Sequence, residues 1–332
     1  MSYLLKPLTI RSMNLANRLV MPPMATAKAG PDGKVSQALL DYCEEKSRGG
    51  FISLIIIEHS YITPEGKASN NQLSVSDDAM IPGLRKLAEV IHRNGSKCAM
   101  QINHAGSAAL KEVTGTTPLA PSAIANPRRG DMPREITRKE IGDIVHAFKE
   151  AGRRVREAGF DAVEIHSAHG YLLNQFLSPL TNKRTDEYGG NISNRIRIHL
   201  QVIQSVRTAV GPDFPIEVRL GASDYTEGGT TIEDSKIAAQ AFETAGVDII
   251  HISGGFVGYT PPGLIGQGYF APLSEAIKSA VSLPVILTGG ITEAEVAEKF
   301  LAAKKADLIG VGRAILQDST WAKCAVERFR PQ

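Results

Sequence analysis

The chain has 332 residues, of which 42% are hydrophobic and 22% are charged, and its formal net charge is +2. This composition is typical of a globular protein and argues against nucleic acid or an anionic membrane as a partner. The cysteines Cys43, Cys98 and Cys324 are scattered and form no CxxC pair, which argues against a disulfide framework, a structural zinc site and an iron–sulfur cluster. Apolar runs are too short for a signal peptide or a membrane span, so we expect a cytoplasmic protein.

Short apolar runs alternate with helical patterns along the chain. The first segment with a clear pattern, "LTIRSMNLANR" (8–18), is predicted to form a short hairpin. The later runs are aliphatic on both faces, which is typical of parallel strands covered by helices. We expect these strands at residues 18–24, 54–60, 97–103, 162–168, 216–222, 249–255, 284–290 and 308–314.

Amphipathic patterns between the runs predict helices at 77–95, 137–159, 231–246 and 292–306. The last of these begins with Thr-x-x-Glu, which predicts a capping box. Strands that alternate with helices predict an α/β fold, a (β/α)8 TIM barrel with the N-terminal hairpin capping the barrel bottom, in a single domain over 1–332. A doubly wound open sheet is the rival fold, but it usually carries a glycine-rich turn after its first strand, and "MPPMATAKAG" (21–30) is not one.

Glycines follow the seventh and eighth strands, at the barrel end where active sites of this fold lie. Gly289 and Gly290 end strand seven, while Gly312 and Arg313 end strand eight and open a helix. Backbone N–H groups at glycines approach an anion closely, and an arginine adds a charge-assisted bond. One such pair would simply mark the end of a strand. Both pairs together predict a phosphate site, and the phosphate would belong to a substrate or to a cofactor.

Two polar side chains interrupt otherwise apolar strands. Arg219 lies within strand five and Gln101 within strand three. An arginine facing the barrel interior is costly to bury without a partner. It therefore either forms a structural salt bridge with Glu58, Glu164 or Glu217, or presents a fixed cation to an electron-rich ligand.

Strand four ends in "HSAHGY" (166–171), which places His166, His169 and Tyr171 on one turn. The two histidines could bind zinc, although no third ligand stands out. They could also be structural groups that satisfy buried carbonyls. In the catalytic interpretation, two imidazoles polarise one ligand oxygen and the phenol delivers a proton.

Taken together, these residues resemble the Old Yellow Enzyme family of FMN-dependent oxidoreductases over nearly the whole chain. The resemblance is most specific in its long central run. The matching runs are "NRLVMPPMAT" (17–26), "IIIEHSYITPEGK" (55–67), "QINHAG" (101–106), "GFDAVEIHSAHGYLLNQFLSPLTNKRTDEYGGNISNR" (159–195), "EVRLGASDY" (217–225) and "LIGVGRAIL" (308–316).

The resemblance implies non-covalent FMN and assigns a role to each matching position. His166 and His169 would hold the substrate's carbonyl oxygen, and Tyr171 would donate the proton. Gln101 and Arg219 would bond the pyrimidine half of the flavin. The other positions implied to contact FMN are Pro23, Met24, Ala25 and His59 beside the ring, and Gly289, Gly290, Gly312 and Arg313 at the phosphate.

The implied reaction is the reduction of an electron-poor alkene conjugated to a carbonyl. NADH or NADPH would reduce the flavin, which would pass hydride to the β-carbon, with Tyr171 protonating the α-carbon. One site would serve both half-reactions. The resemblance also leaves room for nitro compounds or nitrate esters as acceptors, for desaturation, for a flavin-binding protein with little turnover, and for a homo-oligomer.

Two positions depart from the family, and two more invite a further role. Position 25 is alanine, where many members carry Thr or Cys beside the flavin, and Ala27 replaces a substrate-contacting tyrosine of one subgroup. The motifs look closest to the barrel part of 2,4-dienoyl-CoA reductases, which carry an iron–sulfur cluster that is not expected here, so electrons should come directly from a nicotinamide. Arg328 or Arg330 could reach a neighbouring subunit's site, or could belong to a frayed tail.

Overall fold

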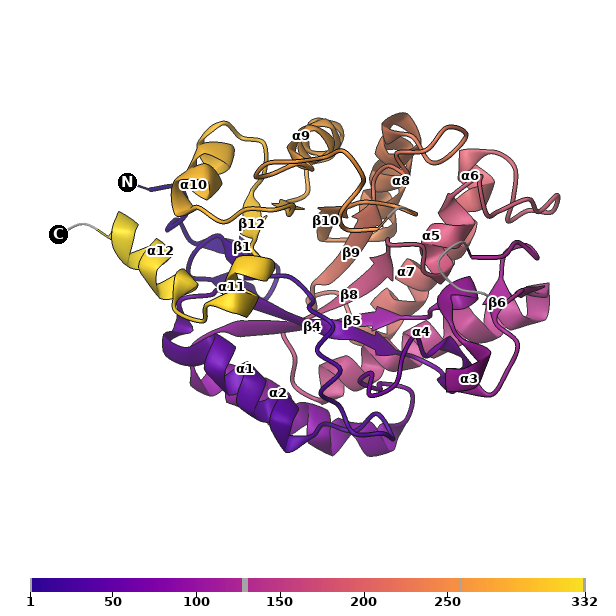
Figure 1. The fold of residues 1–332 in the computed structure, drawn as a ribbon, viewed down its shortest axis with the longest axis horizontal. Coiled ribbons are helices and arrows are strands. Elements are labelled where there is room, and N and C mark those ends of the chain that lie inside the picture. The colour runs from indigo at the N-terminus through magenta and orange to yellow at the C-terminus, as the bar shows by residue number, and fades with distance from the viewer. Residues whose placement is uncertain (1, 127–130, 257, 331–332) are drawn as a thin grey trace.

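The structure is a computed structural model that describes residues 2–126, 131–256 and 258–330. Within this part of the chain, eight parallel strands close into a barrel in the order β10-β11-β12-β3-β4-β5-β8-β9 (Figure 1). The predicted (β/α)8 barrel is therefore confirmed. The strands are β3 (Leu19–Met21), β4 (Leu54–Tyr61), β5 (Lys97–Asn103), β8 (Ala162–Ser167), β9 (Ile216–Gly221), β10 (Ile249–Ser253), β11 (Val285–Leu287) and β12 (Leu308–Gly310).

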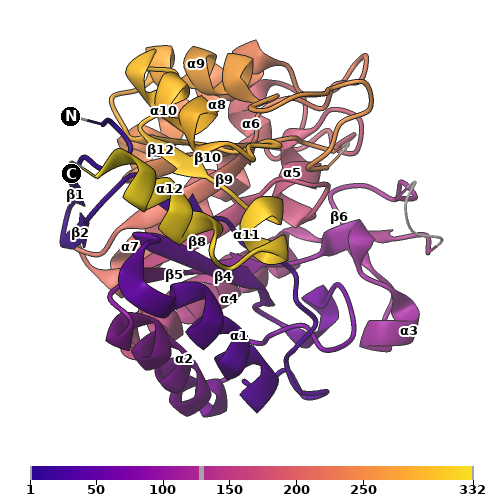
Figure 2. The same ribbon diagram turned by 60° about the vertical axis from the view of Figure 1, so that its left-hand side comes forward.

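Helices surround the barrel, with α1 and α2 on one side and α8, α9 and α10 on the opposite side in both views (Figures 1 and 2). Their apolar faces pack on the outward side chains of the strands, which explains why the strands are apolar on both faces. The longer helices are α1 (Gln37–Ser47), α2 (Ile81–Arg93), α4 (Arg138–Glu157), α7 (Arg197–Val210), α8 (Ile232–Ala245), α9 (Ala271–Ala280), α10 (Ala294–Ala302) and α12 (Trp321–Phe329).

Shorter elements complete the connections between the strands. A small two-stranded sheet, β6 (Leu119–Ala120) and β7 (Arg134–Glu135), lies in the connection after β5. The short helices are α3 (Lys111–Thr114), α5 (Leu172–Leu177), α6 (Ile192–Arg195) and α11 (Arg313–Gln317). No helix in the described ranges is long and apolar enough to cross a membrane.

The N-terminal hairpin closes one end of the barrel, as predicted. It consists of β1 (Leu8–Ile10) paired antiparallel with β2 (Met13–Leu15). Ile10, Met13 and Leu15 are buried against the lowest inward layer of the barrel, in one cluster with Val20, Leu54, Ile56, Ala99, Ala162, Ile249, Ile286 and Leu308. This apolar plug leaves the opposite end, where the strands finish, as the open one.

Three strands end at least three residues earlier than the sequence predicted. The strand expected at 18–24 ends at Met21, because Pro22 and Pro23 have no N–H to continue the ladder. The strands expected at 284–290 and 308–314 end at Leu287 and Gly310. In each case residues beyond the strand line the cavity at the open end of the barrel.

The predicted capping box at the last helix is wrong. Helix α10 has Glu293 at its N-cap and no side-chain capping bond, because the backbone N–H groups of Thr292 and Glu293 both donate to Gln267 Oε1. Capping boxes form instead at α4, through Thr137 and Glu140, and at α8, through Thr231 and Asp234.

Candidate active site

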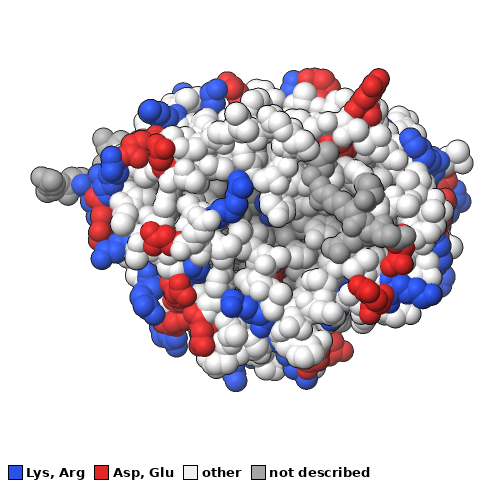
Figure 3. Space-filling model, viewed as in Figure 1, with Lys and Arg blue, Asp and Glu red and all other residues white. Residues whose placement is uncertain are grey.

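A cavity of about 900 Å³ opens among the C-terminal ends of the strands. The space-filling view shows a hollow bordered mainly by uncharged residues (Figure 3). The structure brings every residue that the resemblance implied to contact FMN or the substrate to this one cavity. Its lining includes Pro23, Met24, Ala25, His59, Gln101, His166, His169, Tyr171, Arg219, Gly289, Gly290, Gly312 and Arg313.

Strand β8 and the turn after it supply an aromatic cluster on one wall of the cavity. The rings of His166 and His169 meet edge to face with centroids 5.0 Å apart, and Tyr171 lies 5.1 Å from His166. His59 stacks on Tyr171, and its Nε2 lies 3.4 Å from the phenol oxygen. Three imidazoles and one phenol therefore converge on the same small volume.

The backbone of this turn is unusual and is held by buried amides. His169 has φ 62° and Gly170 has φ 73°, so two consecutive residues are left-handed. Such a conformation is uncommon for a residue other than glycine. Asn174 Oδ1 accepts from the Gly170 N–H at 2.7 Å, and Gln175 Nε2 donates to the Gly170 carbonyl at 2.6 Å. Both amides are fully buried on α5, so this short helix fixes where His169 and Tyr171 stand.

Strand β4 supplies His59 through an irregularity. His59 lies inside β4, within the strand expected at 54–60, where the pairing with β5 shifts register between Ile57 and Ser60. A local bulge of this kind redirects side chains beside active sites. It lets His59 line the cavity from within the strand.

Two histidines of the cluster, His59 and His166, are neutral near pH 7. Burial, followed by the charges of His169 and Arg219, holds the pKa of His166 well below its usual range. Burial and the Arg219 cation lower the pKa of His59 to about 4. A neutral imidazole donates one hydrogen bond and accepts one, so it polarises a ligand oxygen without giving up a proton.

The neighbouring strand β9 carries the fixed cation, with Arg219 paired in register with His166. Arg219 is buried, and among the described residues no carboxylate forms an ion pair with it. Its Nε lies inside the protein without a hydrogen-bond partner. A structural salt bridge with Glu58, Glu164 or Glu217 is therefore not what holds this side chain. Burial lowers the pKa of Arg219 and Glu164 raises it, and the cation faces the cavity beside Gln101.

Glycines shape the third wall, where the phosphate site was predicted. Gly289 has φ 120° and Gly290 has φ 71°, and a Cβ at Gly290 would come within 2.8 Å of the Gly266 carbonyl oxygen. A Cβ on Gly312 would meet Met24 Sδ at 3.0 Å. Side chains are thus excluded here, and the backbone stays open to a ligand. Arg313 Nη2 donates to Tyr269 Oη at 3.2 Å at the rim.

The loop after β3 is held from below by a buried carboxylate. Glu58 accepts a hydrogen bond from the Thr26 N–H, and burial raises the pKa of Glu58. Ala27 is left-handed, with φ 52°. This clamp places Ala25 at the cavity wall, where its backbone is its only polar contribution.

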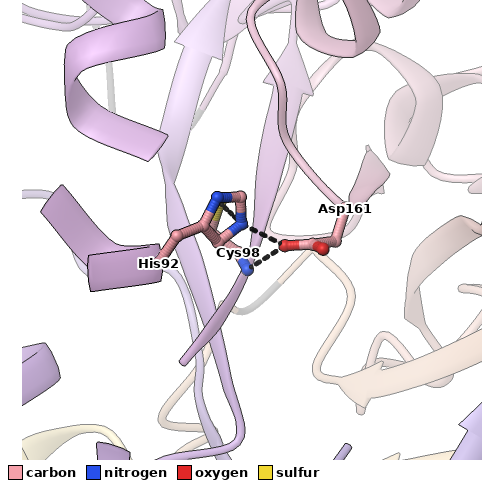
Figure 4. A group of neighbouring side chains, drawn as sticks. All are labelled: His92, Cys98 and Asp161. Carbon is pink, nitrogen blue, oxygen red and sulfur yellow. Dashed lines mark hydrogen bonds and ion pairs between the residues drawn. The ribbon is translucent and has the colours of Figure 1, made fainter. Parts of the chain in front are cut away.

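A second cluster of potential ligands lies near the N-terminal ends of the strands, away from the cavity (Figure 4). Asp161 accepts from His92 Nε2 at 2.6 Å, from the Cys98 N–H at 2.9 Å and from Lys97 Nζ at 2.9 Å. These bonds tie α2, β5 and the start of β8 together. Burial raises the pKa of the Cys98 thiol well above its usual range, and the Lys97 ammonium would repel a metal cation bound here. The cluster therefore has the features of a structural link between these elements.

The chain matches the NADH:flavin oxidoreductase / NADH oxidase family over residues 3–331. The chain belongs to this family. The predicted resemblance to the Old Yellow Enzyme family is thereby confirmed.

Individual relatives agree with this family. The chain is 43% identical to the NADH oxidase of Thermoanaerobacter brockii, covering 96% of this chain and 50% of that protein. It is 38% identical to the NADPH dehydrogenase of Clostridium acetobutylicum, covering 93% and 90%. The structure of morphinone reductase in complex with tetrahydroNAD superposes with a TM-score of 0.84 at 27% identity, covering 99% of this chain and 92% of that one. The chain thus spans about half the length of the first relative and most of the other two.

Several cavity residues of this family member were not found from the sequence. Ser253, at the end of β10, lies 2.7 Å from His169 Nε2 through its Oγ. The rule that barrel strand ends carry the site could have indicated it, since "IIHIS" reads as a strand. Tyr259 and Tyr269 also line the cavity, from the connection between β10 and α9, where no periodic pattern points to a site.

Proposed function

We propose that the protein is an FMN-dependent NAD(P)H oxidoreductase that reduces the C=C bond of α,β-unsaturated carbonyl compounds. The observation that carries this proposal is the convergence of His166, His169 and Tyr171 on one cavity that also holds Arg219. Oxygen-binding donors, a proton source and a fixed cation are the groups that hydride addition to a conjugated alkene requires.

The cavity fits FMN in three respects. Arg219 is a buried cation with an unpartnered Nε, which suits the pyrimidine carbonyl region where reduced flavin gathers negative charge. Gly289, Gly290 and Gly312 keep backbone groups accessible to a phosphate, with Arg313 at the rim. The volume of about 900 Å³ exceeds what a substrate alone needs. When bound, the flavin would supply hydride to the alkene and would be reduced again by NADH or NADPH.

The side chains of this chain then act on the substrate as follows. His166 and His169 donate hydrogen bonds to the carbonyl oxygen and stabilise the negative charge that develops there. Burial lowers the pKa of His166, so this imidazole stays neutral and donates a hydrogen bond without giving up its proton. Tyr171 gives its phenol proton to the α-carbon. His59, stacked on Tyr171 with Nε2 3.4 Å from the phenol oxygen, orients that oxygen.

A Tyr171→Phe variant tests this assignment because the two half-reactions use different groups. Reduction of the flavin by NADH or NADPH should proceed within about twofold of wild type, since it needs no proton donor. Alkene reduction should fall by about 10²-fold or more, as expected on losing a general acid. Stopped-flow absorbance of the flavin separates the two steps.

The control is Tyr259→Phe, which alters a phenol at the cavity mouth. Equal loss in both half-reactions of Tyr171→Phe would indicate a packing role for Tyr171 and would contradict the proposal. Normal alkene turnover in this variant would contradict it as well. A wild-type enzyme that reduces nitro compounds or nitrate esters but no enone would point to the other acceptor class.

A further inference from the structure

Beneath the floor of the cavity lies a second layer of polar side chains. Glu164, Glu217 and His251 are fully buried and do not line the cavity. Each stands two residues before a residue that does, so it faces the same interior one step lower in the barrel. Neighbouring strands hold the layer in register, with Glu164 opposite both Gln101 and Glu217.

Glu164 is the hub of this layer. Its Oε1 accepts a hydrogen bond from Gln101 Nε2 at 2.7 Å, and its Oε2 is paired with His251 Nδ1 at 2.5 Å. An ionised carboxylate accepts hydrogen bonds and donates none. The nitrogen of the Gln101 amide must therefore face Glu164, which leaves the amide oxygen of Gln101 as the acceptor presented to the cavity.

The two neighbouring carboxyl groups carry different charges. Both carboxyl oxygens of Glu217 are buried without a hydrogen-bond partner. Burial, and then the negative charge of Glu164, raise the pKa of Glu217 well above its usual range, which favours its neutral form. Burial lowers the pKa of His251, which leaves the imidazole neutral beside Glu164. Glu164 thus provides a negative charge below the cavity floor, close to the Arg219 cation. Its field opposes part of the positive potential that Arg219 projects into the cavity.

We propose that Glu164, held by His251, is a positioning residue that sets the affinity and the reduction potential of the bound flavin. It does so in two ways: it fixes the Gln101 amide with its oxygen toward the ring, and it offsets part of the Arg219 charge. This inference depends on the proposed function, since it concerns the same FMN site. A carboxylate at this place lowers the potential and makes the reduced flavin a stronger hydride donor.

The structure offers a matched pair of variants. Glu164→Gln removes a negative charge, whereas Glu217→Gln replaces one neutral group by another on the adjacent strand. The readouts are the dissociation constants of oxidised and reduced FMN and the midpoint potential, measured against a reference dye. We expect Glu164→Gln to shift the ratio of the two constants at least tenfold in favour of reduced FMN. For a two-electron couple this corresponds to a rise of about 30 mV. Glu217→Gln should match wild type.

Glu164→Asp separates the two effects and serves if Glu164→Gln fails to fold. The shorter aspartate keeps the negative charge but cannot reach the Gln101 amide. The midpoint potential should therefore stay near that of wild type, while oxidised FMN binds about tenfold more weakly. A Glu164→Gln potential equal to those of wild type and Glu217→Gln would overturn the charge role. Unchanged FMN affinity in Glu164→Asp would overturn the positioning of Gln101. A wild-type protein that binds no FMN would instead contradict the proposed function.

Discussion

At the scale of single residues, burial decides how the histidines act. Burial lowers the pKa of His59 and His104 to about 4 and that of His199 to about 3. A histidine whose pKa is lower in the folded state than its ordinary value of about 6.5 resists protonation only while the protein is folded. Acid therefore favours the unfolded chain, which binds the proton that the folded chain refuses.

His199 isolates this effect because it lies outside the cavity. It is buried on α7, stacked on Phe242, with Nε2 2.8 Å from Ser167 Oγ. Its contribution to stability is fully present above pH 6.5 and falls as the pH drops toward 3. The free energy of unfolding lost in a His199→Gln variant should consequently be about 2 kcal/mol smaller at pH 5 than at pH 7.5.

Urea denaturation of wild type and variant at both pH values measures this difference. His146→Gln, at an exposed position on α4, controls for the loss of one histidine. A His199→Gln penalty that stays constant or grows on acidification would contradict a neutral buried His199.

Residue types and spacing were enough to indicate most of the candidate site. His166, His169 and Tyr171 could be found because they crowd a strand end, and Arg219 because it interrupts an apolar strand. The sequence left open whether Arg219 forms a salt bridge, since three carboxylates were within reach along the strands. That question depends on rotamers across the barrel, which periodicity does not encode. Glu164 was considered only as a partner for Arg219, whereas the structure pairs it with Gln101 and His251.

At the scale of secondary-structure elements, the same sequence signal has two outcomes. The patterns at 137–140 and 292–295 both read Thr-x-x-Glu. At α4 the Thr137 side chain accepts from the Glu140 N–H and Glu140 bonds back to the Thr137 N–H. At α10 the side chain of Gln267, far away in sequence, accepts from the Thr292 N–H, which the Glu295 side chain would accept in a capping box. A tertiary contact thus overrides the local motif.

This difference predicts unequal costs for two similar substitutions. Thr137→Ala should lower the free energy of unfolding by about 1 kcal/mol, because it removes a working N-cap. Thr292→Ala removes an exposed hydroxyl that caps nothing, so its cost should be a few tenths of a kcal/mol. Urea denaturation of both variants makes the comparison. Equal destabilisation by the two changes would contradict the assignment of the caps.

Strand ends were the least predictable elements. Apolar runs at 18–24, 284–290 and 308–314 continue past the last paired residue, so hydrophobicity alone extends the strands too far. Proline at positions 22 and 23 and glycine at 289 and 290 mark where pairing stops. The residues released from the ladder are those that line the cavity.

At the scale of the whole molecule, the apolar residues that close the barrel and the residues of the candidate site lie at opposite ends of the strands. The hairpin β1–β2 and the lowest inward layer are apolar, while charge and hydrogen-bonding groups increase toward the open end. Alternation of strands and helices was sufficient to predict this arrangement, because few folds accommodate parallel strands that are apolar on both faces.

The C-terminal arginines have partners in their own chain: Arg328 pairs with Glu295, and Arg330 lies 5.8 Å from the ring centre of Phe51. Their role in a neighbouring subunit, and oligomerisation itself, stay predictions.

The most direct test of the account is an anaerobic single-turnover measurement. The protein is reconstituted with FMN, reduced with one equivalent of NADH or NADPH, and mixed with 2-cyclohexen-1-one while flavin absorbance is followed. The account predicts rapid reoxidation of the flavin with one equivalent of cyclohexanone formed per FMN. A flavin that binds and is reduced but stays reduced in the presence of the enone would contradict it.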